Sequence, residues 1–329
     1  MSTRPAVLVT GGAGYVGSHV CKALDRAGVT PVTLDNLSTG HRWAVKWGPL
    51  EIGDVRDTGF VADVITRHSL TAVLHFAALS LVGESAQRPF DYYENNVFGA
   101  VSLVSAMRRC GLSKIVFSST CAVYGVPDEL PIEETEATRP VNVYGRTKLA
   151  VEHFLADMAA SGALSVAMLR YFNAAGADSD GEIGEAHEPE SHLIPLAIGA
   201  TLKLRPPINV FGSDYPTPDG TCLRDYIHVE DLAEAHLKAL KLLETATGCR
   251  AYNLGTGKAV SVREVLRSVE RVLGAKVPVI ESDRRAGDPP QLYAAPGRAK
   301  QELDWAASRS DIDFIVASAA RWHRNGNHR

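Results

Sequence analysis

The first half of the chain alternates short apolar runs with stretches in which apolar residues recur at helical spacing. The runs are typical of buried strands and lie at 7–10, 32–35, 50–55, 72–78, 114–120 and 165–170. The helical stretches between them lie at 14–24, 60–68, 89–109 and 143–160. Strands that are apolar on both faces and alternate with helices predict a parallel, doubly wound sheet with right-handed crossovers. The predicted fold class is therefore α/β.

The pattern changes after residue 174. Residues 175–189 are rich in glycine and acidic residues, and pairs of prolines interrupt the sequence that follows. We therefore expect two domains, one of residues 1–174 that holds the sheet and a smaller mixed α/β domain of residues 175–329. Within the second, 231–243 is a predicted helix, and 251–254 is a predicted strand that can return to the first sheet.

Glycines end the first apolar run and precede the first predicted helix. Gly11, Gly12, Gly14 and Gly17 satisfy both G-x-G-x-x-G and G-x-x-G-x-x-G. Residues without a Cβ let the backbone turn tightly and approach a pyrophosphate, which the helix N-terminus binds with its N–H groups. Asp35 ends the second strand, where a carboxylate binds the ribose hydroxyls of NAD and repels the 2′-phosphate of NADP. The pattern predicts a Rossmann domain that binds NAD; a glycine-rich turn without a ligand is the alternative.

Tyr144 and Lys148 are four residues apart and so share one face of a predicted helix. A phenol, with a pKa of about 10, becomes a useful base only when cations stabilise the phenolate. Lys148 is one such cation, and an oxidised nicotinamide ring is another. Ser119 and Thr120 end a predicted strand at the sheet edge where ligands bind, and either hydroxyl could hold a substrate hydroxyl. Taken alone, the Tyr–Lys pair could equally belong to a solvated helix face.

Composition and charge narrow the function classes. The formal net charge of -4 gives no basic field, which argues against a nucleic-acid partner. No apolar run approaches the ~20 residues that span a bilayer, and the first strand follows the N-terminus too closely for a signal peptide. The five cysteines are scattered without a C-x-x-C, and no His or Cys cluster has the spacing of metal ligands. We expect a cytoplasmic protein without a metal or a membrane partner.

Longer segments resemble a known family. They lie at 10–19, 35–38, 75–78, 82–85, 93–96, 144–148, 169–177, 220–229, 252–255 and 284–288. Through them the chain resembles, essentially end to end, the UDP-glucose (UDP-galactose) 4-epimerases of the extended short-chain dehydrogenase/reductase superfamily.

The resemblance implies a redox-neutral 4-epimerisation of a UDP-sugar, UDP-galactose to UDP-glucose. Tyr144 would remove the proton from the sugar O4 while NAD takes the C4 hydride. The resulting 4-keto sugar would turn its other face to the same cofactor and take the hydride back, so that NAD stays bound throughout. The resemblance also implies a homodimer in which helices near 91–109 and 143–160 pack across a two-fold axis.

The resemblance further assigns the residues of the site. Those expected to contact or surround NAD are Gly11, Gly14, Tyr15, Val16, Gly17, Asp35, Asn36, Asp54, Val55, Phe76, Ala77, Ala78, Asn95, Ser118, Tyr144, Lys148 and Tyr171. Those expected to bind the UDP-sugar are Thr120, Asn173, His192, Leu193, Asn209, Val210, Phe211, Arg224, Tyr226, Arg285, Asp288 and Leu292. Arg224 and Arg285 would each bind a phosphate, which a forked guanidinium matches in a bidentate way. Arg224 could instead form a structural ion pair with a nearby acid such as Asp225, and Phe211 could belong to the core.

The substrate stays less certain than the reaction class. Leu292 lies at the position that gates sugar size in the resembled family, and a leucine there favours UDP-glucose and UDP-galactose over N-acetylhexosamines such as UDP-N-acetylglucosamine. UDP-xylose and UDP-arabinose would also fit. Ser80 replaces a lysine that reaches the cofactor phosphates in some members. A nucleotide-sugar 4,6-dehydratase would need an acid and a base after Thr120, where this chain has Cys121 and Ala122. A dehydrogenase that releases NADH and a non-catalytic NAD sensor are the remaining alternatives.

Overall fold

A parallel seven-stranded sheet forms the centre of the computed structural model, which describes residues 4–285 and 288–326. The strand order is β11-β6-β5-β4-β1-β2-β3, and every neighbouring pair is parallel. This is the Rossmann strand order with one strand added at the edge. The chain adds strands on one side of β1 as far as β3, and from β4 onward it adds them on the other side. The strands are β1 (Ala6–Thr10), β2 (Thr30–Asp35), β3 (Leu50–Ile52), β4 (Val73–His75), β5 (Lys114–Thr120), β6 (Ser165–Tyr171) and β11 (Gly248–Leu254).

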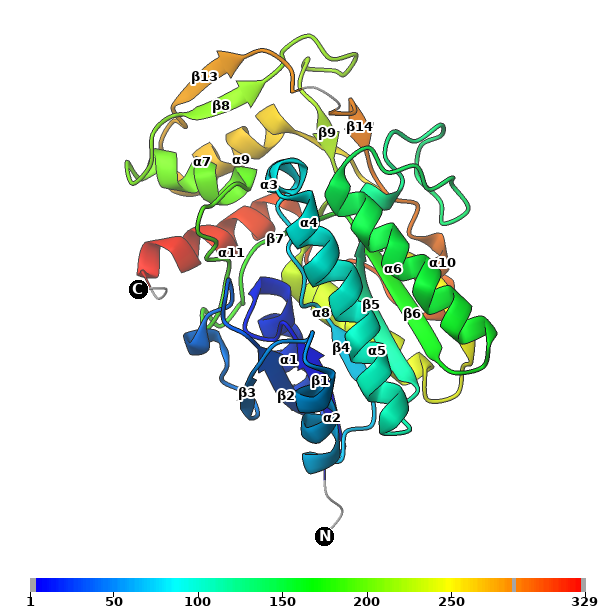
Figure 1. Cartoon of the computed structure of the whole chain (residues 1–329). Helices are drawn as coiled ribbons and strands as arrows, with labels where there is room; N and C mark the ends of the chain where they lie inside the picture. The colour runs from blue at the N-terminus through cyan, green and yellow to red at the C-terminus, as the bar shows by residue number, and fades with distance from the viewer. Residues whose placement is uncertain (1–3, 286–287, 327–329) are drawn as a thin grey trace.

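Helices cover both faces of this sheet, as the strand composition predicts (Figure 1). One face packs on α2 (Thr58–Arg67), α5 (Gly99–Arg109) and α6 (Val143–Ala160), whose buried apolar residues share a core with Leu8, Ile115 and Val166. The other face packs on α1 (Tyr15–Arg26) and α8 (Val229–Leu242). Burial on both faces explains why the strands are apolar throughout rather than alternating.

The stretch predicted as one helix over 89–109 is helical along its whole length but not uniform. It consists of α4 (Pro89–Tyr92), the π-helical turn η2 (Tyr93–Phe98) and α5. Asn96 lies in the π-helical turn and is buried. Its amide oxygen accepts from the backbone N–H of Leu79 at 2.8 Å, and its nitrogen donates to the Thr147 hydroxyl at 3.1 Å. The turn thus joins α6 to the loop that follows β4, and π-helical turns are frequent at functional sites.

The second half of the chain builds a smaller layer from short sheets and helices. Its helices α7 (Leu193–Thr201), α9 (Val262–Leu273) and α11 (Ile312–Asn325) enclose a separate core and lie together above the large sheet in Figure 1. Its strands are β7 (Asn173–Ala175), β8 (Ile208–Phe211), β9 (Leu223–Arg224), β10 (Tyr226–His228), β12 (Val260–Ser261), β13 (Val279–Ser282) and β14 (Gln291–Leu292). The remaining short helices are η1 (Arg42–Ala44), α3 (Val82–Gln87), η3 (Cys121–Val123) and α10 (Gly297–Glu302).

The predicted return of residues 251–254 to the first sheet is confirmed. β11 pairs with β6 over its whole length, from Gly248 with Ser165 to Leu254 with Tyr171. Helix α8 also comes from the second half and packs on the large sheet beside α1. The chain therefore crosses the boundary predicted at residue 174 more than once, and the division into two domains stays a prediction. Among the described residues, no helix is both long and apolar enough to cross a membrane.

Candidate active site

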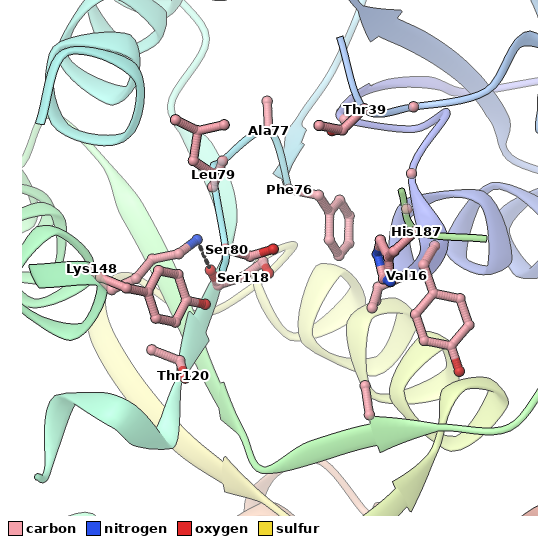
Figure 2. A pocket seen from close by; sticks show the side chains of 18 of the residues that line it. Val16, Thr39, Phe76, Ala77, Leu79, Ser80, Ser118, Thr120, Lys148 and His187 are labelled. Carbon is pink, nitrogen blue, oxygen red and sulfur yellow. Dashed lines mark hydrogen bonds between the residues drawn. The ribbon is translucent and has the colours of Figure 1, made fainter. Parts of the chain in front are cut away.

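A cavity of about 380 Å³ opens beyond the carboxyl ends of β1, β2, β4, β5 and β6, the place where ligands bind to open parallel sheets. Figure 2 shows Lys148, Ser118 and Thr120 on one side of it, and Phe76 and Val16 on another. Most residues predicted to bind the cofactor line it, namely Gly11, Gly14, Tyr15, Val16, Gly17, Asp35, Asn36, Val55, Phe76, Ala77, Ala78, Asn95, Ser118, Tyr144, Lys148 and Tyr171. We call it the cofactor cavity.

The glycine turn is shaped as the sequence predicts. Gly11 has a φ of +72°, and a Cβ there would lie 2.6 Å from the backbone nitrogen of Ala77. A Cβ on Gly17 would lie 2.3 Å from the carbonyl oxygen of Gly11. Helix α1 begins at Tyr15 with Gly14 as its N-cap, and no side chain caps it there. The turn therefore presents the start of a helix, with its N–H groups, to the cavity.

Asp35 occupies the end of β2 and is buried. Its carboxylate accepts hydrogen bonds from the backbone N–H groups of Ala13 at 3.0 Å and Leu37 at 2.9 Å, which fix its orientation. Burial raises the pKa of Asp35 above its ordinary value, and the two backbone hydrogen bonds oppose that rise. Each oxygen keeps a further acceptor position for a ribose hydroxyl.

Asp54 does not line the cofactor cavity, unlike its neighbours Gly53 and Val55. Its carboxylate is bound in a bidentate way by Arg56, at 2.8 Å to each oxygen, and also accepts from Asn36. The Arg56 guanidinium holds the pKa of Asp54 well below its usual range. The predicted place of Asp54 beside the cofactor stays a prediction: its carboxylate is bound by Arg56 and by Asn36, and Asn36 lines the cavity.

Tyr144 and Lys148 lie in the first two turns of α6, which Asn142 caps by accepting from the Gly145 N–H at 2.8 Å. Lys148 is buried; its Nζ donates to the carbonyl of Ser118 at 2.9 Å and lies 5.9 Å from the centre of the Tyr144 ring. Burial lowers the pKa of Lys148 to about 7, against the opposing charge of Glu152. The pair faces the cavity and not solvent, so the alternative of a solvated helix face is wrong.

Burial raises the pKa of Tyr144 well above its ordinary value. A hydrogen bond with the Thr120 hydroxyl lowers it, but by less. The phenolate is therefore unstable in this wall unless positive charge is brought close to it, from Lys148 and from a bound cationic ligand.

The hydroxyls at the end of β5 point to two different faces, because side chains alternate along a strand. Ser118 and Thr120 line the cofactor cavity, and Ser118 Oγ lies 2.6 Å from the Tyr171 hydroxyl. Ser119 faces α6 and is fully buried, where its hydroxyl donates to Glu152 at 2.5 Å. Of the two alternative hydroxyls, Ser119 and Thr120, only Thr120 lines the cavity beside Tyr144.

Sequence reasoning missed Glu152. Its carboxylate is 2 % exposed and receives Arg170 at 2.9 Å on one oxygen and 2.6 Å on the other. Arg170 in turn donates to the Tyr124 hydroxyl at 2.9 Å. Tyr144, Lys148 and Glu152 follow one another at four-residue intervals on α6, a spacing that could have indicated the carboxylate.

A second cavity, of about 660 Å³, adjoins the cofactor cavity, and Ser80, Asn173, Glu185 and His192 line both. It contains most of the residues predicted to bind the UDP-sugar, namely Asn173, His192, Leu193, Asn209, Phe211, Arg224, Tyr226, Arg285 and Asp288. We call it the substrate-side cavity. Residues 286 and 287 of the motif at 284–288 lie outside the described residues.

Two predicted residues do not line either cavity. Val210 is buried in the core of the second layer, since Asn209 and Phe211 on either side of it take the open face of β8. Leu292 packs against a small apolar cluster that includes Phe172 and Cys121. Cys121 itself lines the cofactor cavity, so Leu292 stands one side chain away from it.

Each of the two arginines of the substrate-side cavity has a partner that also lines this cavity. Arg285 stacks on Phe211, its guanidinium carbon 3.9 Å from the ring centre. Arg224 pairs with Asp288 across the cavity wall. The ion pair considered for Arg224 therefore exists, but with Asp288: the carboxylate of Asp225 is buried and accepts instead from the backbone of Thr256, Gly257 and Ala294.

His192 has an unusual charge environment for a residue that lines both cavities. Burial alone would lower its pKa, but hydrogen bonds and charge from Glu185 and Glu190 raise it to about 10. His187 also contacts Glu185 and lines the cofactor cavity. Of the residues in this segment the sequence analysis predicts only His192 in the site, although the sequence also shows the spacing Glu-x-His-x-x-Glu-x-His at 185–192.

Comparisons with known proteins agree with this geometry. The UDP-glucose 4-epimerase of Rhizobium leguminosarum bv. trifolii is 50% identical over 321 residues, which cover 98% of each chain. The crystal structure of UDP-glucose 4-epimerase from Brucella ovis in complex with NAD is 51% identical, with a TM-score of 0.94 over 96% of this chain and 97% of that one. The UDP-glucose 4-epimerase of Stenotrophomonas maltophila, with bound NAD and formylated UDP-arabinopyranose, is 40% identical with a TM-score of 0.95 over 98% of each chain.

A match to a family model assigns the chain to a protein family. The model described as the NAD dependent epimerase/dehydratase family matches residues 7–255, a span that contains the glycine turn, Asp35, Tyr144 and Lys148. This chain belongs to the NAD dependent epimerase/dehydratase family.

Proposed function

We propose that this chain interconverts UDP-galactose and UDP-glucose by inverting C4 of the sugar, with NAD as a bound cofactor. The main observation in support of this proposal is the position of Tyr144, Lys148 and Thr120. They line a dinucleotide cavity that continues, through Asn173 and His192, into a cavity with two arginines. This arrangement suits a substrate in which a sugar is joined to a diphosphate, and the relatives described as UDP-glucose 4-epimerases support it.

The residues present fit NAD. Without a Cβ, Gly11 packs against Ala77 and Gly17 against Gly11, and this tight turn places the start of α1 at the cavity, which Asp35 also lines. Phe76, Asn95 and the residues that line the cofactor cavity would hold the remaining parts of the dinucleotide. When bound, NAD supplies a hydride acceptor and a positive charge at its nicotinamide ring.

Tyr144 acts as the acid and base at the sugar O4. As the phenolate it takes the proton of the O4 hydroxyl while C4 is oxidised to a ketone, and it returns the proton when C4 is reduced on the other face. Thr120 donates a hydrogen bond toward the phenol oxygen, and the Lys148 ammonium supplies positive charge in the same wall. General acid–base catalysis of this kind contributes about 10²–10⁴-fold in rate.

The substrate-side cavity holds the nucleotide diphosphate. Arg224 and Arg285 bind its phosphates, since a guanidinium stays charged and offers two parallel donors. Asp288 accepts from the uridine ribose, and exchanges part of its contact with Arg224 for that bond. The sugar is thereby tethered at one end, which leaves it free to turn about the diphosphate between the two hydride transfers.

The residues that follow Thr120 in the cavity wall argue against dehydratase activity. Cys121 and Ala122 line the cavity there, and neither provides the extra acid or base that elimination of water requires. Burial raises the pKa of the Cys121 thiol to about 12, so it remains protonated. A UDP-pentose is the second candidate substrate, because one relative was crystallised with a formylated UDP-arabinopyranose.

The test uses purified protein without added NAD. UDP-galactose, UDP-xylose and UDP-N-acetylgalactosamine are incubated in parallel, the nucleotide sugars are separated by chromatography, and the cofactor released on denaturation is measured by absorbance. We expect conversion of UDP-galactose to UDP-glucose together with co-purified NAD. Faster conversion of the pentose would change the substrate and keep the mechanism. If no epimer forms and NADH accumulates once NAD is added, the protein is a dehydrogenase and the proposal is wrong.

We further propose a cytoplasmic homodimer. Phe90 is 74 % exposed and Phe98 is 55 % exposed, and Tyr93 and Val101 on the same helical stretch are also exposed. Four large apolar side chains on one stretch form a surface suited to a partner helix. All five cysteines are free thiols, as a reducing compartment favours. Light scattering should give the mass of two chains for the parent and of one chain for Phe98→Glu; a monomeric parent would contradict the dimer.

A further inference from the structure

Residues 185–192 form a segment between β7 and α7 that borders both cavities. Glu185 and His192 line both of them, and His187 lines the cofactor cavity. In Figure 2 His187 lies beside Val16, across the cavity from Lys148 and Thr120. The acid–base residues and this segment therefore stand on different sides of the same space, and the reaction described above makes no use of His187 or Glu190.

Four side chains of this segment converge on one point. One ligand atom from each of Glu185, His187, Glu190 and His192 lies within 4.8 Å of the others. The Nδ1 atom of His192 is 2.7 Å from Glu185 and 3.0 Å from Glu190, and Nδ1 of His187 is 3.0 Å from Glu185 and 3.9 Å from Glu190. Both imidazoles thus turn the same nitrogen toward the same two carboxylates.

The two carboxylates are withdrawn from water. The side chains of Glu185 and Glu190 are only 5% and 4% exposed. Within residues 4–285 and 288–326, neither carboxylate has a lysine or arginine nitrogen within 4.0 Å, and the ionic partners they do have are the two histidines. Glu190 also accepts from the backbone N–H groups of Ser191 and His192, so among the described residues the charge of these two buried carboxylates is balanced by imidazole and backbone groups alone, the setting in which buried charges pair or bind a metal.

The distances match what a tetrahedral metal ion requires. Zinc binds imidazole nitrogen and carboxylate oxygen at about 2.0–2.1 Å, which places neighbouring tetrahedral ligands about 3.3 Å apart. The Nδ1 atoms of His187 and His192 lie 3.0 and 2.7 Å from Oε1 of Glu185, and Oε1 of Glu190 lies 3.0 Å from His192, all near that value, while the four ligand atoms together lie within 4.8 Å of one another. Two imidazoles with two carboxylates suit zinc and similar transition-metal ions, whereas calcium and magnesium prefer oxygen ligands alone.

We propose that Glu185, His187, Glu190 and His192 bind one divalent transition-metal ion of the zinc type at the junction of the two cavities. The ion has a structural role: it neutralises both carboxylates and fixes the segment 185–192 against Tyr15, whose ring packs edge-on to His187. Because Tyr15 begins α1, the ion would also stabilise the wall of the cofactor cavity. Binding releases the proton held by His192, since a coordinating imidazole nitrogen must be unprotonated.

A second cluster in the same region shows what a site without a metal looks like. Asp178, Asp180 and Glu182 also bring their oxygens close together. The Lys22 ammonium occupies that cluster, 2.7 Å from Asp178, 2.8 Å from Asp180 and 2.6 Å from Glu182. Its negative charge is already compensated by a lysine, so we expect no ion there.

The test uses the full chain with its cofactor and without a polyhistidine tag. The protein is treated with a chelator, freed of it, and titrated with Co²⁺ by visible absorption and with Zn²⁺ by calorimetry. We expect one ion per chain, the strong visible bands of tetrahedral Co²⁺, their loss when Zn²⁺ is added, and a higher melting temperature with Zn²⁺. Lack of saturable binding, or octahedral Co²⁺ bands only, would overturn the proposal.

Two variants locate the ion. His187→Gln removes a nitrogen ligand and should abolish the tetrahedral bands, while Asp180→Asn alters the lysine-filled cluster and should leave them unchanged. Binding that persists in His187→Gln, or that disappears in Asp180→Asn, would overturn the assignment. Should His187→Gln fail to fold, the Co²⁺ spectrum of the parent chain still decides the coordination number and donor type. None of these readouts depends on epimerase activity, so failure of the metal site and failure of the proposed function are distinguishable.

Discussion

Replacing Glu152 by glutamine removes one charge from the buried polar group behind the catalytic helix. The carboxylate accepts three hydrogen bonds from Arg170, at 2.9, 3.2 and 2.6 Å, and one from Ser119. The side chains of Arg170 and Glu152 are 9% and 2% exposed. Removing one partner of such a buried pair leaves an uncompensated charge and destabilises a protein by about 3–5 kcal/mol. Since glutamine keeps one oxygen acceptor, we expect about 3 kcal/mol for Glu152→Gln, measured by chemical denaturation.

The same change acts on Lys148, four residues earlier on α6. Burial lowers the pKa of Lys148 to about 7, and the Glu152 charge opposes that effect. Without that charge the pKa of Lys148 falls further. In the proposed mechanism Lys148 assists Tyr144 only while it is protonated, so we expect activity to be lost as the pH rises through its pKa, and in the variant this loss should move to lower pH. A fall of one pKa unit reduces the protonated fraction above the pKa about tenfold.

The assay is the pH dependence of kcat for conversion of UDP-galactose by the parent, by Glu152→Gln and by Asp178→Asn. Asp178 and Lys22 form a comparably buried ion pair, at 1% and 6% side-chain exposure, away from α6. We expect both variants to lose stability and only Glu152→Gln to show the shifted alkaline limb. An unshifted limb in Glu152→Gln would refute the idea that Glu152 maintains the charge of Lys148, and a shift in both variants would assign the effect to general loosening.

Three further predictions concern the cavities. Tyr144→Phe should retain NAD, measured after denaturation, and lose at least ~10²-fold in turnover, the range for a general acid–base group; unchanged turnover would remove Tyr144 from the mechanism. Leu292→Gly should open activity on UDP-N-acetylgalactosamine, because it empties space beside Cys121 and Phe172; if chromatography shows no gain, the gate lies elsewhere. Asp35→Ser should raise the affinity for NADP relative to NAD by about tenfold, or 1.4 kcal/mol, in titrations of protein freed of its nucleotide; an unchanged ratio would mean that Asp35 does not select the cofactor.

Much of the fold is predictable from the sequence because each strand of the large sheet is a separate apolar run. The glycine turn and Asp35 were equally accessible, since the spacing between glycines translates directly into backbone geometry. The π-helical turn at Tyr93–Phe98 was not, because one extra residue per turn hardly changes a hydrophobic pattern.

The parts of the site that the sequence leaves open have a common physical origin. Alternation along β5 shows that Ser118 and Thr120 share a face, yet it does not say which face meets the cavity, so the sequence cannot choose between Ser119 and Thr120. Asp54 lies between two cavity-lining residues, and the sequence does not show that Arg56 and Asn36 bind its carboxylate. The convergence of residues 185–192 depends on the path of an irregular segment, and no periodicity predicts such a path.

The late position of β11 in the chain bears on how the protein is made. Strand β6 pairs with β5 on one side and with β11 on the other, but the ribosome completes β6 at residue 171 and β11 only at residue 254. At 5–20 residues per second the interval is on the order of ten seconds. During that time β6 is the edge of the emerged sheet and carries an unpaired row of N–H and C=O groups. For most of it α8 does not yet cover the face of the sheet beside α1. The nascent chain therefore exposes a sheet edge that can pair with another chain during this interval, and a chaperone present during translation should raise the yield of folded protein.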